Sequence, residues 1–462
     1  MKYFGFTTFR DIDCTFYVDD ESIELLPLKV DNNKLINKYF DEKDFYFEYN
    51  YWHNFINIAY VEKISHSMNG GIILKPKFTI ENPHKEKITN IILSGLDIDY
   101  FFSPSSYFFY LKRNNTDISK DIIYNDLIAD EWNIVFDDKA IKIELLYGNI
   151  LNKGIASDLK LHPKIKISFS AINDYLFIYR LKAMIVKFLQ VVLYRKRISS
   201  INTELWTTKE NGNPSYVGKL LDHINKDNLD FKGYSEIKYV NYKEYISLFL
   251  DFVAKNIDLN IEHFPNESPR FTGYKYSQNL VVSIFSAFEF ECRKNVELYE
   301  YIDDSQYKEI RKKTLNSIKE INCSSPEEEQ FKKNAYDRIV QLGTQFGQKA
   351  KIINAYSKLS NVLANSLNSI FFLHKLENNN SLSYQEIESF AKYLADLRGK
   401  NAHGSSNFLI SEKNTQIIRF LEIITYCQLL KRIGLNDKDV EMIIGEVFCC
   451  NNLMQSEKIF AK

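Results

Sequence analysis

A short polar segment near the C-terminus, LRGKNAHG at residues 397–404, brings together an arginine, a lysine, an asparagine and a histidine. Arg398 and His403 stand at its two ends, with Lys400 and Asn401 between them. A histidine, with an ordinary pKa of about 6.5, can accept or donate a proton at neutral pH. An arginine stays charged and offers paired hydrogen bonds to phosphate oxygens. The set predicts metal-free RNA cleavage, in which a ribose 2′-hydroxyl loses a proton and attacks the adjacent phosphate.

The spacing from Arg398 to His403 is weak on its own. For a chain of this composition, chance alone gives an arginine followed four to six residues later by a histidine about 0.6 times. Its context strengthens it, because it is the one such match in the sequence and is bracketed by Gly399 and Gly404. Both glycines are expected to let the chain turn sharply, with the helix before them ending at Arg398.

A helical pattern over 384–398 must position the arginine. Its apolar residues recur at intervals of three and four, which is typical of an amphipathic helix. They are Ile387, Phe390, Leu394 and Leu397. Arg398 therefore lies at the helix end, beside the apolar stripe. Ser383 and Glu386 have the spacing of a capping box that starts this helix.

The rest of the C-terminal part also has helical periodicity, which predicts an all-α domain over 243–462. The expected helices cover 243–257, 276–301, 305–321, 326–345, 350–375, 384–398, 413–433 and 437–448.

The N-terminal part has a different pattern. Short runs rich in Tyr, Phe, Ile and Val alternate with turn signals such as Asn-Gly-Gly at 69–71, which is typical of a β-sandwich or open barrel. An amphipathic helix from about residue 178 closes this module, which we assign to 1–203. Residues 204–242 are expected to form an irregular connector with room for two strands. The predicted fold class is α+β, a β-rich sandwich-like module followed by a helical bundle.

Composition excludes several classes of protein. The 59 basic and 60 acidic side chains leave a net charge of −1, which does not suit a general nucleic-acid coat. The sequence holds no nucleotide-binding glycine motif, no HExxH and no GxSxG, and its six cysteines have no zinc spacing, so no cofactor and no metal is expected. No signal peptide or transmembrane stretch is evident, and we expect a cytoplasmic protein without a membrane partner.

The segment LRGKNAHG, in a helical domain that follows a β-rich module, resembles the HEPN ribonuclease superfamily, in particular the Apea-like HEPN proteins of bacterial anti-phage defence. The helix NLVVSIFSAFEFECRKN at 279–295 is similar to the first long helix of that domain. The resemblance covers residues from about 243 to 450.

The resemblance implies a metal-independent endoribonuclease in which Arg398 binds the scissile phosphate and His403 is the acid and base. It also implies a homodimer, because two such motifs usually meet across a dimer to form one composite site. The family usually has a polar residue directly after the arginine. This chain has Gly399 there, so Lys400 or Asn401 is expected to supply that contact.

Glu289 and Arg293, four residues apart on the upstream helix, have two interpretations. They can form an ordinary surface ion pair along the helix. Alternatively, Glu289 reaches the active groove and orients Arg398 or His403, as polar residues on this helix do in related proteins. Both stay open at the level of the sequence.

Charge is uneven along the chain and bears on the expected partners. Residues 1–50 carry a net charge of −5, whereas 305–360 carry +5. The basic stretch is either a solvated helix surface or a face for RNA, with tRNA among the candidate substrates.

Three functional hypotheses follow. The first is a toxin-like ribonuclease that acts in abortive infection. The second is a non-catalytic adaptor that dimerises or binds RNA through the helical domain and binds a ligand with the β-module. The third is a ribonuclease that stays latent until a phage-derived or small-molecule trigger binds the N-terminal module.

Overall fold

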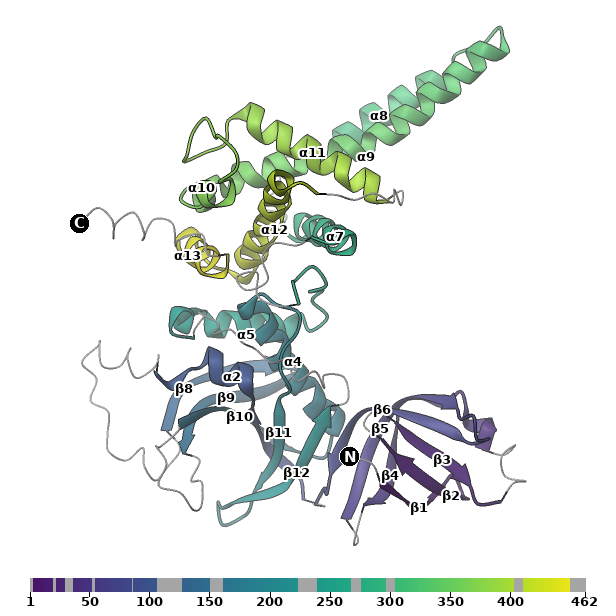
Figure 1. The fold of residues 1–462 in the computed structure, drawn as a ribbon, viewed down its shortest axis with the longest axis vertical. Helices are drawn as coiled ribbons and strands as arrows, with labels where there is room; N and C mark the ends of the chain where they lie inside the picture. Colours follow the sequence, from purple (N-terminus) through teal and green to yellow (C-terminus); the bar gives the residue numbers. More distant parts are fainter. Residues whose placement is uncertain are drawn as a thin grey trace, which may run out of the picture. The chain divides into compact units, whose positions relative to one another are not determined.

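The structure of the chain is a computed structural model that describes residues 3–19, 22–29, 36–51, 55–84, 86–105, 127–149, 161–222, 239–266, 276–295, 304–402 and 410–448. A large antiparallel sheet forms in the N-terminal part and a group of helices in the C-terminal part (Figure 1). This confirms the predicted α+β fold class. Within the described ranges, no helix is long and apolar enough to cross a membrane.

The sheet has twelve strands, all paired antiparallel. Its main path runs β1-β2-β3-β6-β12-β11-β7-β10-β9-β8, and β4 joins through β5 to β6. The strands are β1 (Tyr3–Phe9), β2 (Ile12–Val18), β3 (Ile23–Pro27), β4 (Phe45–Tyr51), β5 (Phe55–His66), β6 (Ile72–Glu81), β7 (Ile88–Ser94), β8 (Leu127–Phe136), β9 (Lys139–Asn149), β10 (Leu161–Ile172), β11 (Asn202–Thr208) and β12 (Pro214–Asp222).

Strand β6 joins the two halves of this sheet. Along one edge it pairs first with β3, at Ile72–Leu74, and then with β12, at Phe78–Glu81, while β5 occupies the other edge. Pro76 lies between the two partners, and the pairing with β5 is irregular opposite it. Proline has no N–H to give to a ladder, so it is tolerated where the pairing is interrupted.

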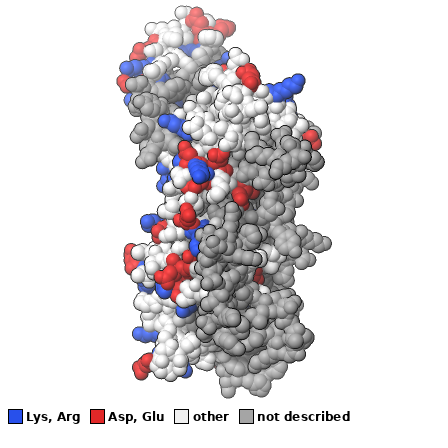
Figure 2. All heavy atoms as spheres, turned by 90° about the vertical axis from the view of Figure 1, so that its left-hand side faces the viewer, with Lys and Arg blue, Asp and Glu red and all other residues white. Residues whose placement is uncertain are grey.

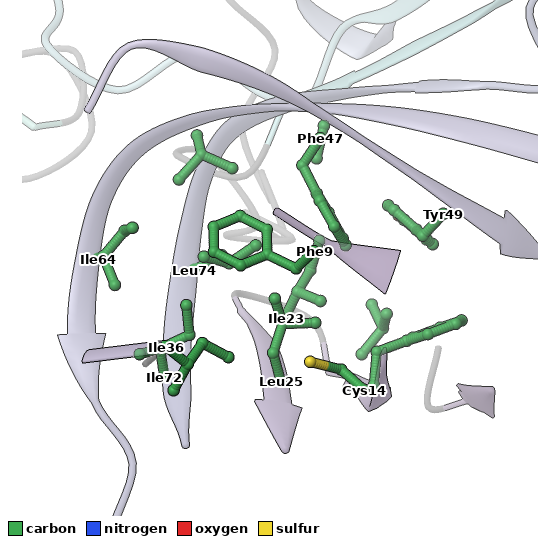
Figure 3. Packing of buried hydrophobic residues seen from close by; sticks show 14 of the residues in the cluster. Phe9, Cys14, Ile23, Leu25, Ile36, Phe47, Tyr49, Ile64, Ile72 and Leu74 are labelled. Atoms are coloured by element: carbon green, nitrogen blue, oxygen red, sulfur yellow. The ribbon is translucent and has the colours of Figure 1, made fainter. Parts of the chain in front are cut away.

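The first half of the sheet encloses its own apolar core. Side chains from β1 to β6 point toward one another in Figure 3, where Phe9 meets Phe47 with ring centroids 5.9 Å apart. The alternating burial along β2 places Cys14 and Phe16 in this core. Burial raises the pKa of the Cys14 thiol to about 11, so it is a packing group rather than a reactive thiol.

The predicted amphipathic helix is α4 (Tyr175–Leu193), and its apolar residues are buried against the sheet. Tyr179 stacks on Phe78 of β6 with centroids 4.9 Å apart. Lys182 lies among these apolar groups and pairs with Asp222 of β12 at 3.6 Å. Burial lowers the pKa of Lys182, and the Asp222 carboxylate opposes that shift. The helix therefore closes the module with one internal ion pair.

Two shorter helices also lie among the described residues of this part of the chain. They are α2 (Leu96–Phe101), which contacts β10, and α5 (Ile246–Lys255), which packs on β8. The described residues here also include short 3-10 turns at Asn37–Tyr39, Tyr239–Asn241 and Lys243–Tyr245.

The C-terminal part contains α7 (Gln278–Lys294), α8 (Asp304–Lys319), α9 (Pro326–Leu363), α10 (Leu367–Ile370), α11 (Tyr384–Ala402), α12 (Glu412–Ile433) and α13 (Asp437–Val447). Helix α12 is buried on all sides between Gln416 and Leu430, which makes it the centre of this group. It contacts α7, α9, α10, α11 and α13. The predicted start of α13 is confirmed, because the Asn436 side chain caps the Asp439 amide at 3.0 Å.

Helix α12 carries a buried carboxyl group, that of Glu422. Its two oxygens accept hydrogen bonds from the hydroxyls of Tyr194, at 2.9 Å, and Tyr276, at 2.6 Å. Burial raises the pKa of Glu422, and the two tyrosine donors partly oppose this. Tyr194 follows α4 with a left-handed φ of 47°, a conformation that costs a residue other than glycine about 1–3 kcal/mol. Its burial and its bond to Glu422 offset that cost.

The chain divides into two compact units, 1–192 with 197–258 and 193–196 with 259–462. This differs from the expected domain limits of 203 and 243. The stretch 204–242, expected as an irregular connector with room for two strands, contributes most of β11 and all of β12, and both strands lie in the middle of the sheet. Helix α5, expected in the helical domain, belongs to the first unit, where Lys243 just before it pairs with Asp130 of β8 at 3.2 Å. These long-range pairings leave no local sign in the sequence.

The prediction of separate helices at 326–345 and 350–375 also differs from the structure. One helix, α9, runs from Pro326 to Leu363 and passes through Gly347. A glycine inside a helix costs about 1 kcal/mol relative to alanine, which a long helix with a good start tolerates. Ser325 supplies that start by capping the Glu328 amide.

Candidate functional site

Helix α11 positions the arginine of the LRGKNAHG segment. The predicted capping box starts it: the Ser383 hydroxyl and amide both donate to the Glu386 carboxylate, and the Glu386 amide donates back to Ser383. Although burial acts to raise the pKa of Glu386, amide donors from Ser383 and Glu377 hold it below its ordinary value. The predicted apolar stripe is buried, from Ile387 to Leu397. Arg398, beside this stripe, is therefore held on a well-anchored helix.

The expectation that Gly399 ends this helix is wrong. Helix α11 continues through Gly399 and Lys400 to Ala402. A side chain at Gly399 would meet no atom within 4 Å, so no close contact requires a glycine there. The glycine propensity alone did not outweigh the hydrogen bonds gained by another turn of helix. As a result, Arg398 lies within a helix, and Asn401 follows it one turn later in the same helix.

Helix α7, the helix of the FEFECRKN stretch, faces α11 and α12. The Ser277 hydroxyl caps it by accepting from the Leu280 amide at 3.2 Å. Its buried residues include Val281, Phe285 and Phe288, which fix one side of the helix in the bundle. This orientation directs two acidic residues of the same turn, two positions apart, toward different neighbours.

Glu289 is the first of these, and it pairs with Arg398. The distance from the Glu289 carboxylate to the Arg398 guanidinium is 2.7 Å, with side chains 27% and 41% exposed. Among the described residues, Glu289 makes no ion pair with Arg293, which is exposed on the same helix. Of the two interpretations of Glu289, the geometry therefore agrees with the one that directs it to Arg398. At this exposure the pair adds only about 0–1 kcal/mol to stability.

Glu291 is the second, and sequence reasoning missed it. Its two carboxylate oxygens accept from the Arg432 guanidinium of α12 at 2.8 and 2.7 Å, and Asn295 donates to it at 3.2 Å. Burial raises the pKa of Glu291, and the Arg432 donors oppose this. The sequence did contain a signal for this ion pair, because Glu291 lies next to Cys292 on the apolar stripe, and a buried acidic residue requires a partner.

The remaining predicted site residues are placed only in part. Arg293 and Lys400 have exposed side chains. Asn401 lies in the last turn of α11. His403 lies outside the described residues, as does Gly404. The structure thus brings Glu289 and Arg398 together at the end of α11, directly before the position of His403 in the chain.

The comparison with protein families gives one match to this region. Residues 281–439, which run from α7 to the start of α13, match the family model described as Apea-like HEPN. This part of the chain is an Apea-like HEPN domain. The match confirms the family predicted from LRGKNAHG and indicates a nuclease or RNA-related role for the protein. No curated protein and no solved structure is significantly similar to the chain.

The basic stretch 305–360 coincides with α8 and α9 of the HEPN domain. Its acidic residues include Glu327, Glu328 and Glu329 in the first turn of α9, where carboxylates favour the helix start. The face of the molecule in Figure 2 shows acidic and basic side chains interspersed over its described surface. Within the described ranges, no group of three or more histidines, cysteines or acids is placed to hold a metal ion.

Proposed function

We propose that this protein is a metal-independent endoribonuclease. The observation that carries the proposal is the position of Arg398 about one turn before the end of α11 in a HEPN domain, paired with Glu289 and five residues before His403. His403 removes the proton of the ribose 2′-hydroxyl, which attacks the adjacent phosphorus. The bond to the 5′-oxygen breaks, and that oxygen takes a proton from the same histidine or its counterpart. The products are a 2′,3′-cyclic phosphate and a free 5′-hydroxyl.

Arg398 stabilises the charge that builds on the phosphate in this reaction. A guanidinium has five N–H donors, and the Glu289 pair engages only part of them. Since the side chain is 41% exposed, donors remain accessible to a phosphate. Glu289 acts as a positioning residue, because it limits the rotamers of Arg398 before the substrate arrives. Lys400, Asn401 and Arg293 provide further contacts to the RNA backbone.

We further propose that two copies of the domain form the working enzyme. Each chain has one Arg398 and one His403, and a proton must be removed and another delivered on opposite sides of one phosphate. Two motifs that meet across a homodimer supply both groups. In the cell, such an enzyme serves abortive infection and is held latent until a trigger acts on the N-terminal module.

The proposal is tested with purified full-length protein, total RNA or tRNA, and EDTA. Wild-type protein is expected to cleave RNA and leave 2′,3′-cyclic phosphate ends, while Arg398→Ala and His403→Ala are expected to lose at least a hundredfold in rate. Arg10→Ala is the matched control, because Arg10 is also a half-exposed arginine, 46% exposed and paired with Glu42 at 2.8 Å. It should cleave like the wild type.

Two outcomes would overturn the proposal. One is equal cleavage by the wild type and the Arg398 and His403 variants, which would point to a contaminating nuclease. The other is normal RNA binding without turnover, including after infection of cells that carry the gene, which would support the non-catalytic adaptor instead.

A further inference from the structure

A cleft of about 850 Å³ opens at one end of the sheet in the first unit. Four neighbouring strands end or begin there: β12, β11, β7 and β10. The short helix α2, which follows β7, contributes Leu96 and Asp99 to the lining. The volume lies in the range of sites that bury a small organic molecule rather than a single ion.

The walls of the cleft are fixed by contacts across the chain. The Asp97 amide of α2 donates to the Ser199 hydroxyl at 3.0 Å, and the Ser199 amide donates back to the Asp97 carboxylate. Gly95 allows this approach, because a Cβ there would lie 2.8 Å from the Ser200 carbonyl oxygen. Asp97 and Ser199 lie 102 residues apart in the sequence. Because these hydrogen bonds hold the walls in place, the cavity is preformed, which reduces the entropy lost when a ligand binds.

Two lysines of this cleft have no acidic partner. Lys164 of β10 and Lys219 of β12 line it from either side, and no carboxylate of the described residues forms an ion pair with either. Both side chains are half-buried. Glu204 lies directly opposite Lys219 in the register of β11 and β12 but forms no ion pair with it among the described residues, so both ammonium groups still have N–H donors to offer an anionic ligand.

The acidic residues of the cleft are already engaged. Asp222 pairs with Lys182 at 3.6 Å, and Asp99 lies 3.5 Å from the His162 ring. Glu204 accepts from the Trp206 indole at 3.2 Å. Glu204 also accepts from the Asn202 side-chain amide at 3.5 Å. Because a carboxylate has about four lone-pair sites, Asp99 and Glu204 can still accept hydrogen bonds from hydroxyl groups. The cleft thus offers cations and acceptors side by side, with Leu96 and Leu221 as apolar walls.

We propose that this cleft binds a phosphorylated small molecule of nucleotide size, with its phosphate at Lys164 and Lys219 and its hydroxyl groups at Asp99 and Glu204. Nucleoside phosphates and sugar phosphates share this chemistry. Lysines bind phosphate as point charges, and carboxylates bind sugar hydroxyls through charge-assisted hydrogen bonds. The site belongs to the sheet unit, and the inference does not depend on the ribonuclease activity of the HEPN domain.

Titration calorimetry on the full-length protein in phosphate-free buffer tests the site. The probes are the four nucleoside 5′-monophosphates, ribose 5-phosphate, adenosine and inorganic phosphate. We expect at least one phosphorylated organic probe to bind with a Kd below 1 mM, and adenosine and inorganic phosphate to bind at least tenfold more weakly. If a nucleotide binds more tightly than ribose 5-phosphate, the base contributes to binding. If the two bind with equal affinity, the sugar phosphate is sufficient. Either result supports the proposal.

Variants connect the binding to this cleft. Lys164→Gln and Lys219→Gln are each expected to weaken binding about tenfold, and the double variant about a hundredfold. Lys75→Gln is the matched control, because Lys75 is an exposed lysine on β6 that does not line the cleft. Thermal midpoints should be unchanged, since none of these lysines forms an ion pair within the described part of the chain.

The proposal is overturned if no phosphorylated probe binds below 1 mM, if inorganic phosphate binds as tightly as the organic phosphates, or if the double variant keeps wild-type affinity. None of these outcomes bears on RNA cleavage. If the protein binds the phosphorylated ligand but does not cleave RNA, only the ribonuclease proposal is refuted.

Discussion

The same substitution at two glutamates of α7, two residues apart, is expected to change different properties of the protein. Glu289→Gln and Glu291→Gln each remove one negative charge and keep the size of the side chain. Glu289 pairs with Arg398 at the half-exposed end of α11, whereas Glu291 holds Arg432 inside the bundle. We predict that the first substitution affects activity and the second affects stability.

The size of the stability effect follows from burial. The side chains of Glu291 and Arg432 are 5% and 13% exposed, so the glutamine variant leaves a nearly buried guanidinium without its carboxylate. Removal of one partner from such a pair costs about 3–5 kcal/mol. For a unit of this size, 1 kcal/mol lowers the thermal midpoint by about 2–4 °C, which gives a fall of about 6–20 °C. Loss of the Glu289 pair costs at most about 1 kcal/mol, or less than about 4 °C.

Differential scanning fluorimetry and the RNA cleavage assay separate the two effects. Glu289→Gln should keep its midpoint and lose about tenfold in cleavage rate, because Arg398 is no longer held in one orientation. Glu309→Gln is the control, since Glu309 forms a largely exposed ion pair with Lys313 along α8, with side chains 66% and 75% exposed. The reasoning fails if Glu289→Gln lowers the midpoint as far as Glu291→Gln, or if Glu291→Gln leaves it unchanged.

Two further predictions concern stability. Gly399→Ala should raise the thermal midpoint by about 2–4 °C, because alanine favours a helix by about 1 kcal/mol and the site has open space; a lower midpoint would mean that α11 does not continue past Arg398. At pH 7.5, the thermal midpoint of Glu422→Gln should equal or exceed that of the wild type. Near pH 4.5, the two proteins should have the same thermal midpoint. Because burial raises the pKa of Glu422 in the folded state, its contribution is complete below its unfolded pKa and is lost as the pH rises toward the folded value. A variant less stable than wild type at pH 7.5 would contradict this.

The parts of the fold that depend on local pattern could be predicted from the sequence. The stripe from Ile387 to Leu397 and the capping box at Ser383 are encoded within one or two turns of α11, and the structure has both. The periodicity of α4 is equally local. For the site, the pairing of Glu289 with Arg398 was one of two interpretations that the sequence left open, and the geometry agrees with it.

The parts that depend on distant partners could not be predicted in this way. The three neighbours of β6 come from positions before and after it in the chain, and the place of β12 beside it is decided by long-range pairing. Gly399 was expected to end its helix, but α11 continues through it, and α9 passes Gly347, which lies between two helices that were expected separately. Glu291 needed Arg432, 141 residues away, to explain its burial.

The four residues Leu193–Lys196 have a consequence for how this protein can be divided. They belong to the helical unit, although they lie between two segments of the sheet unit, so the chain passes between the units three times. A fragment that begins at residue 259 lacks Tyr194, and with it one of the two hydroxyls that satisfy the buried Glu422. The helical unit is therefore not contiguous in the sequence, and a fusion or truncation that preserves the Tyr194–Glu422 hydrogen bond must retain this tetrapeptide.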